Sequence, residues 1–382
     1  MKVTFVSNYI NHHQIPVSNR LFERLGADYA FVQTEKMEEE RVQMGWNPDT
    51  ASLPYLLLYE KDPEGAMGRI MDSDVVIFGG TDEESYIKPR LRAGKIVIRY
   101  SERIYKTGQW KFISPRGLKK KYEDHTQYRK SPVYLLCSGA YVASDFNLVR
   151  AYPKKKMKWG YFPATKQYDL DTLMAGKEKA YERGCIEILW AARFIDWKHP
   201  EMVVRLADSL KRADYNFHIT MIGGGVMKEE IEKMAQDLNL EDKISLAGFK
   251  TPDEVRSCME QANIYLVTSD RQEGWGAVVN EAMNSGCAVV GDVMVGAVPY
   301  LIQDGVNGRI YQTKSQKSLE LAVKDLLDHP EWIGEMGRNA YQTISNTWNA
   351  GVAADRLLEF MEDLLAGQVN MEKWKDGPMS RA

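Results

Sequence analysis

The 382-residue sequence contains only four cysteines, and they are far apart. Cys137, Cys185, Cys258 and Cys287 stand singly, mostly within apolar runs. This distribution excludes a disulfide framework and a zinc site built from closely spaced thiols. It indicates reduced, buried cysteines in a cytoplasmic protein.

Long apolar segments are also absent. No run approaches the roughly 20 residues that a membrane-crossing helix requires, and the short apolar run of the N-terminal MKVTFVSNYI passes directly into polar residues. We therefore expect neither a membrane span nor a secretory signal peptide. With 44% hydrophobic and 27% charged residues, the composition is that of a globular protein long enough for two domains.

The sequence lacks the dinucleotide fingerprint G-x-G-x-x-G at the start of a helix. GGGVMK, residues 223–228, does not fit it, which disfavours an NAD-dependent oxidoreductase. Two Asp-x-Asp patterns occur, at residues 72–74 and 169–171. The first leads into an apolar strand and the second lies in a polar segment, so we interpret both as coincidental and expect no catalytic metal and no cofactor.

Apolar runs typical of buried strands alternate with helical segments along the chain. They lie at residues 3–7, 29–33, 55–59, 73–80, 95–100, 134–138 and 158–162, and again at 186–192, 218–223, 243–247, 264–267 and 288–291. This alternation predicts an α/β protein with two Rossmann-like βαβ domains, whose ligands bind at the carboxyl ends of the strands. We place the domains at residues 1–164 and 185–350, with a linker at 165–184 and a C-terminal helix and tail at 351–382.

One stretch, TSDRQEGWGAVVNEAMNSGCAVVG (residues 268–291), joins a strand, a glycine-containing loop, a helix and a further strand. Glycines at a helix N-terminus expose backbone N–H groups that attract anions. Glu281 lies in the second turn and leans back toward that terminus, within reach of a ribose hydroxyl pair. Glu273, at the mouth of the loop, can accept hydrogen bonds from a second polyol. Each glutamate taken alone reads as an ordinary surface residue.

The whole arrangement resembles the E-x7-E retaining glycosyltransferases of the GT-B fold, which include family 4-like enzymes of the bacterial polysaccharide type. The matching segments are EGWGAVVNE (273–281), EAMNSGCAVV (281–290) and VGAVPYLIQDGVNGRIY (295–311). The resemblance implies two domains facing a central cleft, with the last helix returning to the first domain. It implies that Glu273 contacts the donor sugar and Glu281 holds the nucleotide ribose. It further assigns diphosphate and sugar contacts to the loop of Gly274, Trp275, Gly276 and Ala277. Phe249 ends LAGF, which resembles the family segment whose backbone reads the base edge, with a plain strand end as the alternative. Gly224 belongs to a run of three glycines that we expect to permit close packing beside the nucleotide.

The segment IEILWAARFIDWKHP (residues 186–200) places Arg193 and Lys198 just past a strand end. By themselves they read as two surface cations flanking a turn. The resemblance implies instead that they bind the donor diphosphate and stabilise the negative charge that the leaving group gains, in place of a metal. The residue before the arginine is Ala192, where the family usually has glycine.

Residues on the acceptor side carry a weaker signal. RYSERIYK (residues 99–106) follows a strand, at a place where related enzymes often have a histidine. This chain has Ser101 and Glu102 there. We assign Ser101 to the acceptor side and Glu102 to catalysis, with an ion pair to a neighbouring arginine as the alternative for Glu102. His12 and His13 follow the first strand, where many relatives have two glycines, and we assign them to the acceptor side too.

Charge is unevenly distributed. Residues 1–164 contain 26 Lys+Arg against 19 Asp+Glu, a net +7, whereas the rest contains 24 against 34, a net −10. Residues 88–158 contain 19 against 4, a net +15, with clusters at 88–92, 116–122 and 154–159. A solvated face is one interpretation. Nucleic-acid binding is disfavoured because no recognisable module is present. The third interpretation is contact with an anionic membrane that carries a lipid-linked acceptor.

We therefore predict a metal-independent, retaining glycosyltransferase. It would move a sugar from a nucleotide diphosphate-sugar, with UDP favoured, to a hydroxyl of a glycan or lipid-linked acceptor in surface polysaccharide or glycolipid assembly. The alternatives are an epimerase or hydrolase of nucleotide sugars on the same fold, and a nucleotide-sugar-binding protein without catalysis. We expect a cytoplasmic location with peripheral contact at the inner membrane face.

Overall fold

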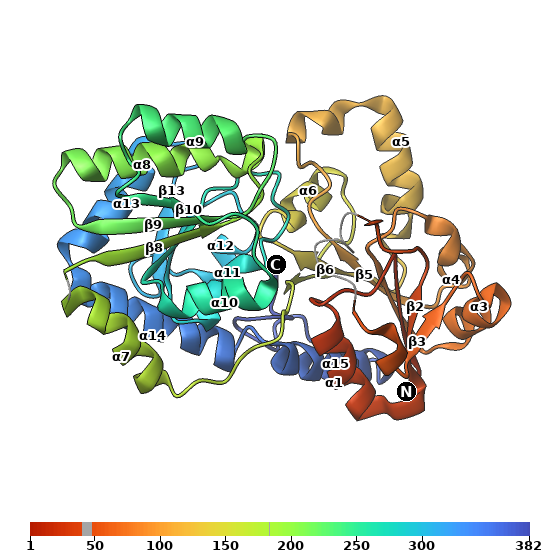
Figure 1. Cartoon of the computed structure of the whole chain (residues 1–382). Helices are drawn as coiled ribbons and strands as arrows, with labels where there is room; N and C mark the ends of the chain where they lie inside the picture. The colour runs from red at the N-terminus through yellow and green to blue at the C-terminus, as the bar shows by residue number, and fades with distance from the viewer. Residues whose placement is uncertain (40–47, 183) are drawn as a thin grey trace. The chain divides into compact units, whose positions relative to one another are not determined.

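The computed structural model describes residues 1–39, 48–182 and 184–382. They form two compact units, each built around one parallel sheet (Figure 1). Unit 1 comprises Met1–Ala164 and Trp348–Ala382, and unit 2 comprises Thr165–Thr347. The predicted fold class, α/β with two Rossmann-like units, is confirmed.

The sheet of unit 1 has the order β3-β2-β1-β4-β5-β6-β7, and neighbouring strands run parallel. The strands are β1 (Val3–Ser7), β2 (Tyr29–Gln33), β3 (Leu56–Leu58), β4 (Val75–Gly79), β5 (Ile96–Ser101), β6 (Val133–Ser138) and β7 (Lys156–Trp159). All five residues of β1 and of β4 are buried. Burial on both faces explains why these strands read as continuous apolar runs and not as alternating ones.

Helices cover both faces of this sheet. They are α1 (Ile15–Leu25), α3 (Pro63–Asp72), α4 (Lys88–Arg92), α5 (Pro115–Asp124), α6 (Val142–Leu148) and α15 (Ala350–Leu365). Side chains of α3, α4 and α6 share one core with Val6 and Val76. The C-terminal helix α15 packs against α1 and its Phe360 ring meets Tyr134 edge-on at 5.3 Å, so the end of the chain belongs to unit 1 (Figure 1).

The sheet of unit 2 has the order β10-β9-β8-β11-β12-β13, again parallel throughout. The strands are β8 (Ile186–Ala191), β9 (Phe217–Ile222), β10 (Ile244–Leu246), β11 (Ile264–Val267), β12 (Ala288–Asp292) and β13 (Gly308–Tyr311). Sequence analysis predicted all of these except β13. That strand was missed because its four residues, GRIY, include a glycine and an arginine and carry too little apolar periodicity.

Two groups of helices cover this second sheet. The helices are α7 (Leu170–Glu182), α8 (Pro200–Arg212), α9 (Lys228–Asp237), α10 (Pro252–Gln261), α11 (Val278–Asn284), α12 (Val298–Leu301), α13 (Gln316–Asp328) and α14 (Pro330–Asn346). α8 packs against α9 and α13, whereas α11 packs against α10 and α14 (Figure 1). In the described part of the chain, no helix combines the length and hydropathy needed to cross a membrane.

The segment expected to be a linker, residues 165–184, lies within unit 2 instead. Its backbone is fixed there because the Lys166 N–H donates to Asn284 Oδ1 at 2.8 Å. The Lys177 side chain is buried and donates to the Met259 carbonyl at 2.7 Å. This buried ammonium donates hydrogen bonds to backbone carbonyls and thereby attaches α7 to the rest of unit 2. The polar composition of residues 165–184 does not predict this attachment.

Candidate functional site

In unit 2 the strand order changes direction between β8 and β11, which pair in parallel. At such a point the loops that follow the two strands turn toward opposite sides of the sheet. They leave a crevice at the carboxyl ends of the strands, which is the usual ligand site of open α/β sheets. The loop after β8 carries Arg193 and Lys198, and the loop after β11 carries Glu273. The predicted donor residues thus come from the two loops that this topology brings together.

Lys198 and Glu273 form an ion pair between the two loops, with their side chains only 12% and 17% exposed. The Lys198 ammonium also lies 4.5 Å from the centre of the Trp197 ring. A third contact fixes the backbone, since the Thr268 hydroxyl donates to the Lys198 carbonyl at 2.6 Å. The cation and the carboxylate therefore occupy defined positions beside one another.

A small hollow lies where the two loops meet, and its lining includes Lys198, Glu273 and Gly276. Gly276 has φ = 91°, a conformation that side chains disfavour. A Cβ at this position would also lie 2.9 Å from Val295 Cγ1. Only glycine fits here, so the glycine of the motif shapes the floor of the hollow.

Glu281 lies on α11, and its side chain is half-buried. Burial raises the pKa of this carboxyl group, while the nearby Arg256 guanidinium partly opposes that rise. Among the described residues its carboxylate makes no hydrogen bond or ion pair; Arg256 donates instead to the Glu281 backbone carbonyl, at 2.7 Å. A half-buried carboxylate in this situation is well suited to accept hydroxyl groups from a ligand.

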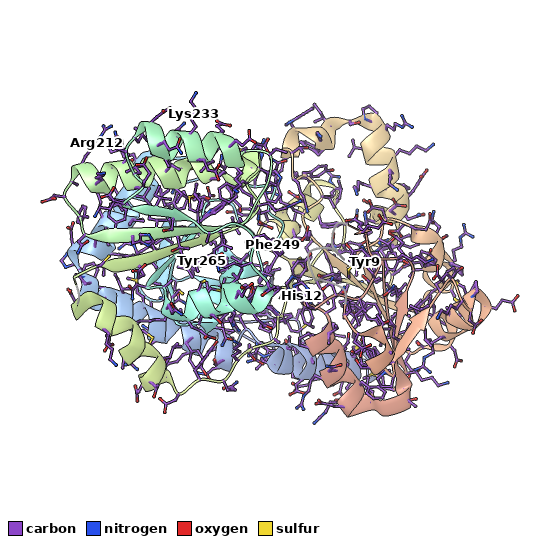
Figure 2. All side chains as sticks on the ribbon, viewed as in Figure 1. Tyr9, His12, Arg212, Lys233, Phe249 and Tyr265 are labelled. Atoms are coloured by element: carbon purple, nitrogen blue, oxygen red, sulfur yellow. The ribbon has the colours of Figure 1, made fainter. Side chains whose placement is uncertain are left out.

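The other predicted donor residues differ in accessibility. The indole of Trp275 is fully buried and donates to Asn280 Oδ1 at 2.8 Å, so this side chain is not available to a ligand. Arg193 is exposed, with its guanidinium 5.9 Å from the Trp197 ring centre. Phe249 is 64% exposed beyond β10 (Figure 2).

The remaining glycine-loop residues are placed by backbone contacts. Gly224 accepts a hydrogen bond from the Phe194 N–H at 2.8 Å, which attaches the loop after β9 to the loop that carries Arg193. Gly274 is buried, and Ala277 occupies the N-cap position of α11. That helix has only seven residues, which makes the expected contribution of a long helix dipole small.

The two Asp-x-Asp patterns have structural partners. The Asp72 carboxylate pairs with the Lys2 ammonium at 2.6 Å, and Asp74 accepts from the Lys2 backbone N–H at 2.8 Å. Asp169 accepts from the Thr172 N–H at 2.9 Å, and Asp171 pairs with Arg338 at 2.6 Å. Within residues 1–39, 48–182 and 184–382, no group of three or more His, Cys, Asp or Glu side chains has a metal-binding arrangement.

In unit 1, Glu102 sits just past β5 and is held by two partners. The Tyr161 hydroxyl and the Lys106 ammonium both contact its carboxylate. The neighbouring arginines are engaged elsewhere, Arg99 with Glu84 at 2.7 Å and Arg103 with Asp145 at 3.6 Å. The alternative of a Glu102–arginine pair is therefore wrong. Sequence analysis did not single out Tyr161, which is 59 residues away in the chain.

The other residues predicted for the acceptor side lie around Glu102 and Tyr161. The Ser101 hydroxyl donates to the Glu102 carbonyl at 2.7 Å. The His13 ring stacks on Tyr161 with 5.5 Å between ring centres, and His12 lies 3.8 Å from His13. Four residues predicted from two separate loops thus form one polar cluster at the carboxyl edge of this sheet.

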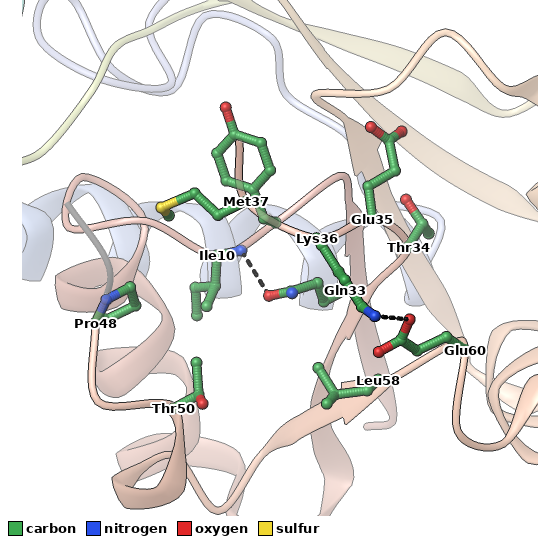
Figure 3. Close-up of a pocket in the computed structure, with 11 residues that line it drawn as sticks. Ile10, Gln33, Thr34, Glu35, Lys36, Met37, Pro48, Thr50, Leu58 and Glu60 are labelled. Carbon is green, nitrogen blue, oxygen red and sulfur yellow. Dashed lines mark hydrogen bonds and ion pairs between the residues drawn. The ribbon is translucent and has the colours of Figure 1, made fainter. Parts of the chain in front are cut away.

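A separate pocket of about 250 Å³ lies beyond β1, β2 and β3 (Figure 3). Ile10 and Leu58 form its apolar part, and the Lys36–Glu60 ion pair, at 3.3 Å, lies at its edge. The Gln33 side chain accepts from the Ile10 N–H at 3.2 Å. None of the residues predicted for the acceptor side lines this pocket.

Residues 177–343 match the family described as "Glycosyl transferases group 1". An uncharacterized glycosyltransferase of Methanocaldococcus jannaschii is 30% identical over 164 residues, which cover 43% of this chain and 44% of that protein. The amylovoran biosynthesis glycosyltransferase of Erwinia amylovora is 26% identical over 184 residues, 47% of this chain and 45% of that protein. The chain spans about half the length of the curated relatives it matches.

Among solved structures, Anabaena HepE in complex with UDP is similar over 95% of this chain and 100% of its own, with a TM-score of 0.70 and 12% identity. Similarity at this identity shows the fold, which is the GT-B fold. The family match, which falls on unit 2, and the similarity to proteins named glycosyltransferases support placement in the GT-B glycosyltransferase superfamily.

Proposed function

We propose, from the premise that residues 177–343 carry the glycosyl transferases group 1 domain, that this protein is a retaining, metal-independent glycosyltransferase. The observation that carries the proposal is the Lys198–Glu273 ion pair at the β8–β11 junction. The half-buried Glu281 carboxylate is nearby in sequence and makes no hydrogen bond or ion pair among the described residues. Unit 2 would bind a nucleotide diphosphate-sugar, and unit 1 would supply the acceptor side.

The chemistry of transfer explains these residue types. When the glycosidic bond breaks, the leaving nucleoside diphosphate gains negative charge, and a fixed cation that meets this charge lowers the barrier. Lys198 is held at a defined position for that role, and exposed Arg193 would assist. Glu273 would orient the donor sugar through its hydroxyl groups, and Glu281 would hold the ribose.

The proposed donor is a UDP-sugar, because a protein of the same fold has been solved with UDP bound. The proposed product is a surface polysaccharide or glycolipid, following the relative that acts in amylovoran biosynthesis. A thermal-shift screen with UDP-, GDP-, ADP- and TDP-sugars identifies the base, since a ligand that binds only the folded state raises its apparent stability.

An epimerase or hydrolase of nucleotide sugars remains the second candidate. Both would use the same donor contacts, but they would consume donor without forming a glycosylated acceptor. In unit 1, the Glu102 cluster favours transfer because it offers a carboxylate fixed by Tyr161 and Lys106 beside which an acceptor hydroxyl can bind.

We expect the product to keep the anomeric configuration of the donor. We expect retention because residues 273–281 resemble the corresponding segment of retaining enzymes. Proton NMR of the first-formed product determines its anomeric configuration from the coupling constant of the anomeric proton. An inverted linkage would contradict the proposed mechanism. Donor consumption without a glycosylated product would instead favour the hydrolase or epimerase.

The three basic clusters differ in burial. Arg90 and Lys156, from two of them, are buried and donate to backbone carbonyls, although Arg92 and Lys154 of the same clusters are exposed. The third cluster, residues 116–122, lies on α5, is mostly exposed and follows the 3₁₀ turn η4 (Gln109–Ile113). We call residues 109–124 the η4–α5 surface. Its large apolar side chains Trp110, Ile113, Leu118 and Tyr122 are all exposed, beside Lys111, Arg116, Lys119 and Lys120.

We propose that the η4–α5 surface docks on an anionic membrane that carries a lipid-linked acceptor. Trp110 is 67% exposed and Ile113 is 65% exposed, which gives the apolar part that interfacial binding needs. Lysine and arginine near an anionic surface contribute about 1 kcal/mol each and act within a Debye length of about 8–10 Å. The proposed location is the cytoplasm, with peripheral contact at the inner membrane face.

Charge reversal on this surface should reduce membrane binding. We expect the double variant Arg116→Glu, Lys119→Glu to sediment several-fold less with anionic vesicles, because each reversal replaces attraction by repulsion. The control reverses Arg212 and Lys233, which project from α8 and α9 of unit 2, and should bind like wild type (Figure 2). Equal binding of wild type to neutral and anionic vesicles would contradict the proposal and favour a soluble acceptor.

A further inference from the structure

Next to Lys198 lies His199, whose backbone is left-handed, with φ = 50° and ψ = 52°. This conformation is uncommon outside glycine, although asparagine, aspartate and histidine adopt it more often than other residues. Seven other residues that are not glycine also have positive φ in the described part of the chain, so the backbone alone does not mark a functional site. The contacts of the His199 ring identify what holds it here.

Two carboxylates flank the imidazole. Nδ1 lies 3.1 Å from Glu201 Oε1, and Nε2 lies 3.5 Å from Asp270 Oδ2. Both contacts favour the protonated ring, and the hydrogen bond with Glu201 is the main reason that the pKa of His199 is raised above its usual value. Asp270 is almost completely buried, with its side chain 4% exposed.

Asp270 in turn organises the loop that carries Glu273. Its backbone N–H donates to the Trp197 carbonyl at 3.0 Å, and its backbone carbonyl accepts from the Glu273 N–H at 3.0 Å. Its Oδ1 accepts from the Gln272 N–H at 2.9 Å. One residue therefore connects the His199 ring to the backbone on both sides of the Lys198–Glu273 pair.

A second copy of the same tripeptide shows what is special about this place. His329, Pro330 and Glu331 repeat the order of residues 199–201 at the start of α14, and the His329 ring lies 3.4 Å from Glu331. That pair is largely exposed, and no second carboxylate contacts the His329 ring in the described part of the chain. The His-Pro-Glu sequence alone thus makes a helix start, whereas the contact with Asp270 and the left-handed backbone occur at His199 and not at His329, whose φ is −130°.

We propose that His199 is a positioning residue, which acts through Asp270 to hold Lys198 and Glu273 in register for sugar transfer. The proposal rests on the proposed function for its catalytic consequence. Its structural part, that the ring fixes the loop from Asp270 to Glu273, is independent of the reaction.

Protonation of the ring should control this connection. Besides Glu201 and Asp270, the charged groups near the ring include Arg205, whose charge acts on Glu201, and Lys314, 3.1 Å from Asp270 Oδ2. They also include the buried Asp292, whose pKa burial raises to about 6. Because the pKa of His199 is raised in the folded protein, the His199–Asp270 attraction is fully present below the usual histidine pKa. It is lost as the pH rises through the folded-state value.

The test replaces His199 by glycine and by asparagine in the full-length protein, both of which accept left-handed backbone without strain. We expect each variant to lower kcat at least about tenfold with KM for the donor within about twofold, since misplaced groups act in the transition state. Asp270→Asn should move the alkaline limb of the kcat profile to lower pH, and His199→Asn should remove that limb. The matched controls, His329→Gly and His329→Asn, should behave like wild type.

Hydrogen exchange followed by mass spectrometry provides a readout without turnover. His199→Asn should speed amide exchange at Gln272 and Glu273, which the His329 variants should leave unchanged. Wild-type kcat and unchanged exchange in His199→Asn would overturn the proposal, as would a lower melting temperature with unchanged kcat. If wild type turns over no donor but exchange still rises, the proposed function fails while the positioning role stands.

Discussion

Replacement of Lys198 by alanine should lower kcat by about two to three orders of magnitude, the usual cost of removing one group that stabilises transition-state charge. KM for the donor should change much less, because the charge that Lys198 meets grows as the glycosidic bond breaks. Steady-state kinetics with the donor identified in the thermal-shift screen measures both constants. An effect confined to KM would mean that Lys198 only binds the ground state.

Two controls separate catalysis from stability. Lys198→Ala leaves the Glu273 carboxylate, 17% exposed, without its cation, so thermal unfolding must show that the variant remains folded at the assay temperature. Lys211→Ala removes another lysine of unit 2, whose ammonium pairs with Asp242 at 2.8 Å on the surface, and should retain wild-type kcat.

Transferase activity should also survive treatment with EDTA. Complete loss of activity, with recovery when Mn²⁺ is added, would contradict the metal-free mechanism.

Glu281→Ala should weaken donor binding at least tenfold without unfolding the protein. A carboxylate that accepts two ribose hydroxyls makes charge-assisted hydrogen bonds worth about 1.5–3 kcal/mol each, and tenfold corresponds to about 1.4 kcal/mol. Isothermal titration calorimetry with the nucleoside diphosphate measures the loss. Unchanged affinity would show that Glu281 does not hold the ribose.

Replacement of Glu281 by glutamine should change stability in the opposite direction, because burial raises the pKa of Glu281 in the folded protein. The cost of the buried charge begins as the pH rises above the usual glutamate pKa and is complete above the raised folded-state pKa. Glu281→Gln should therefore unfold at the same or a higher temperature than wild type near pH 7–8, and the difference should vanish below about pH 4, where the carboxyl group is protonated in both states. Glu260→Ala is the contrast: its carboxylate bonds to Lys166 and Tyr168, so it should lose stability but keep donor affinity.

Local sequence determined the elements of this protein. Strands such as β1 and β11 were predicted at their observed bounds because burial on both faces produces compact apolar runs, and the alternation with helices determined the α/β class. The resemblance of residues 273–281 pointed to a donor site before any geometry was known. These signals depend on neighbours within about ten residues, which is the range over which periodicity acts.

Only the tertiary structure decided which side chains meet. Lys198 and Glu273 are 75 residues apart and pair because β8 lies beside β11, and Asp270 reaches His199 for the same reason. Composition also did not predict which charged side chains are buried. Arg90 belongs to a cluster of basic residues in the sequence, but its side chain lies in the core. Strand order and burial arise from contacts between distant segments, and the same short apolar runs are compatible with many strand orders. The sequence therefore suggests candidate site residues but does not say which side chains contact one another.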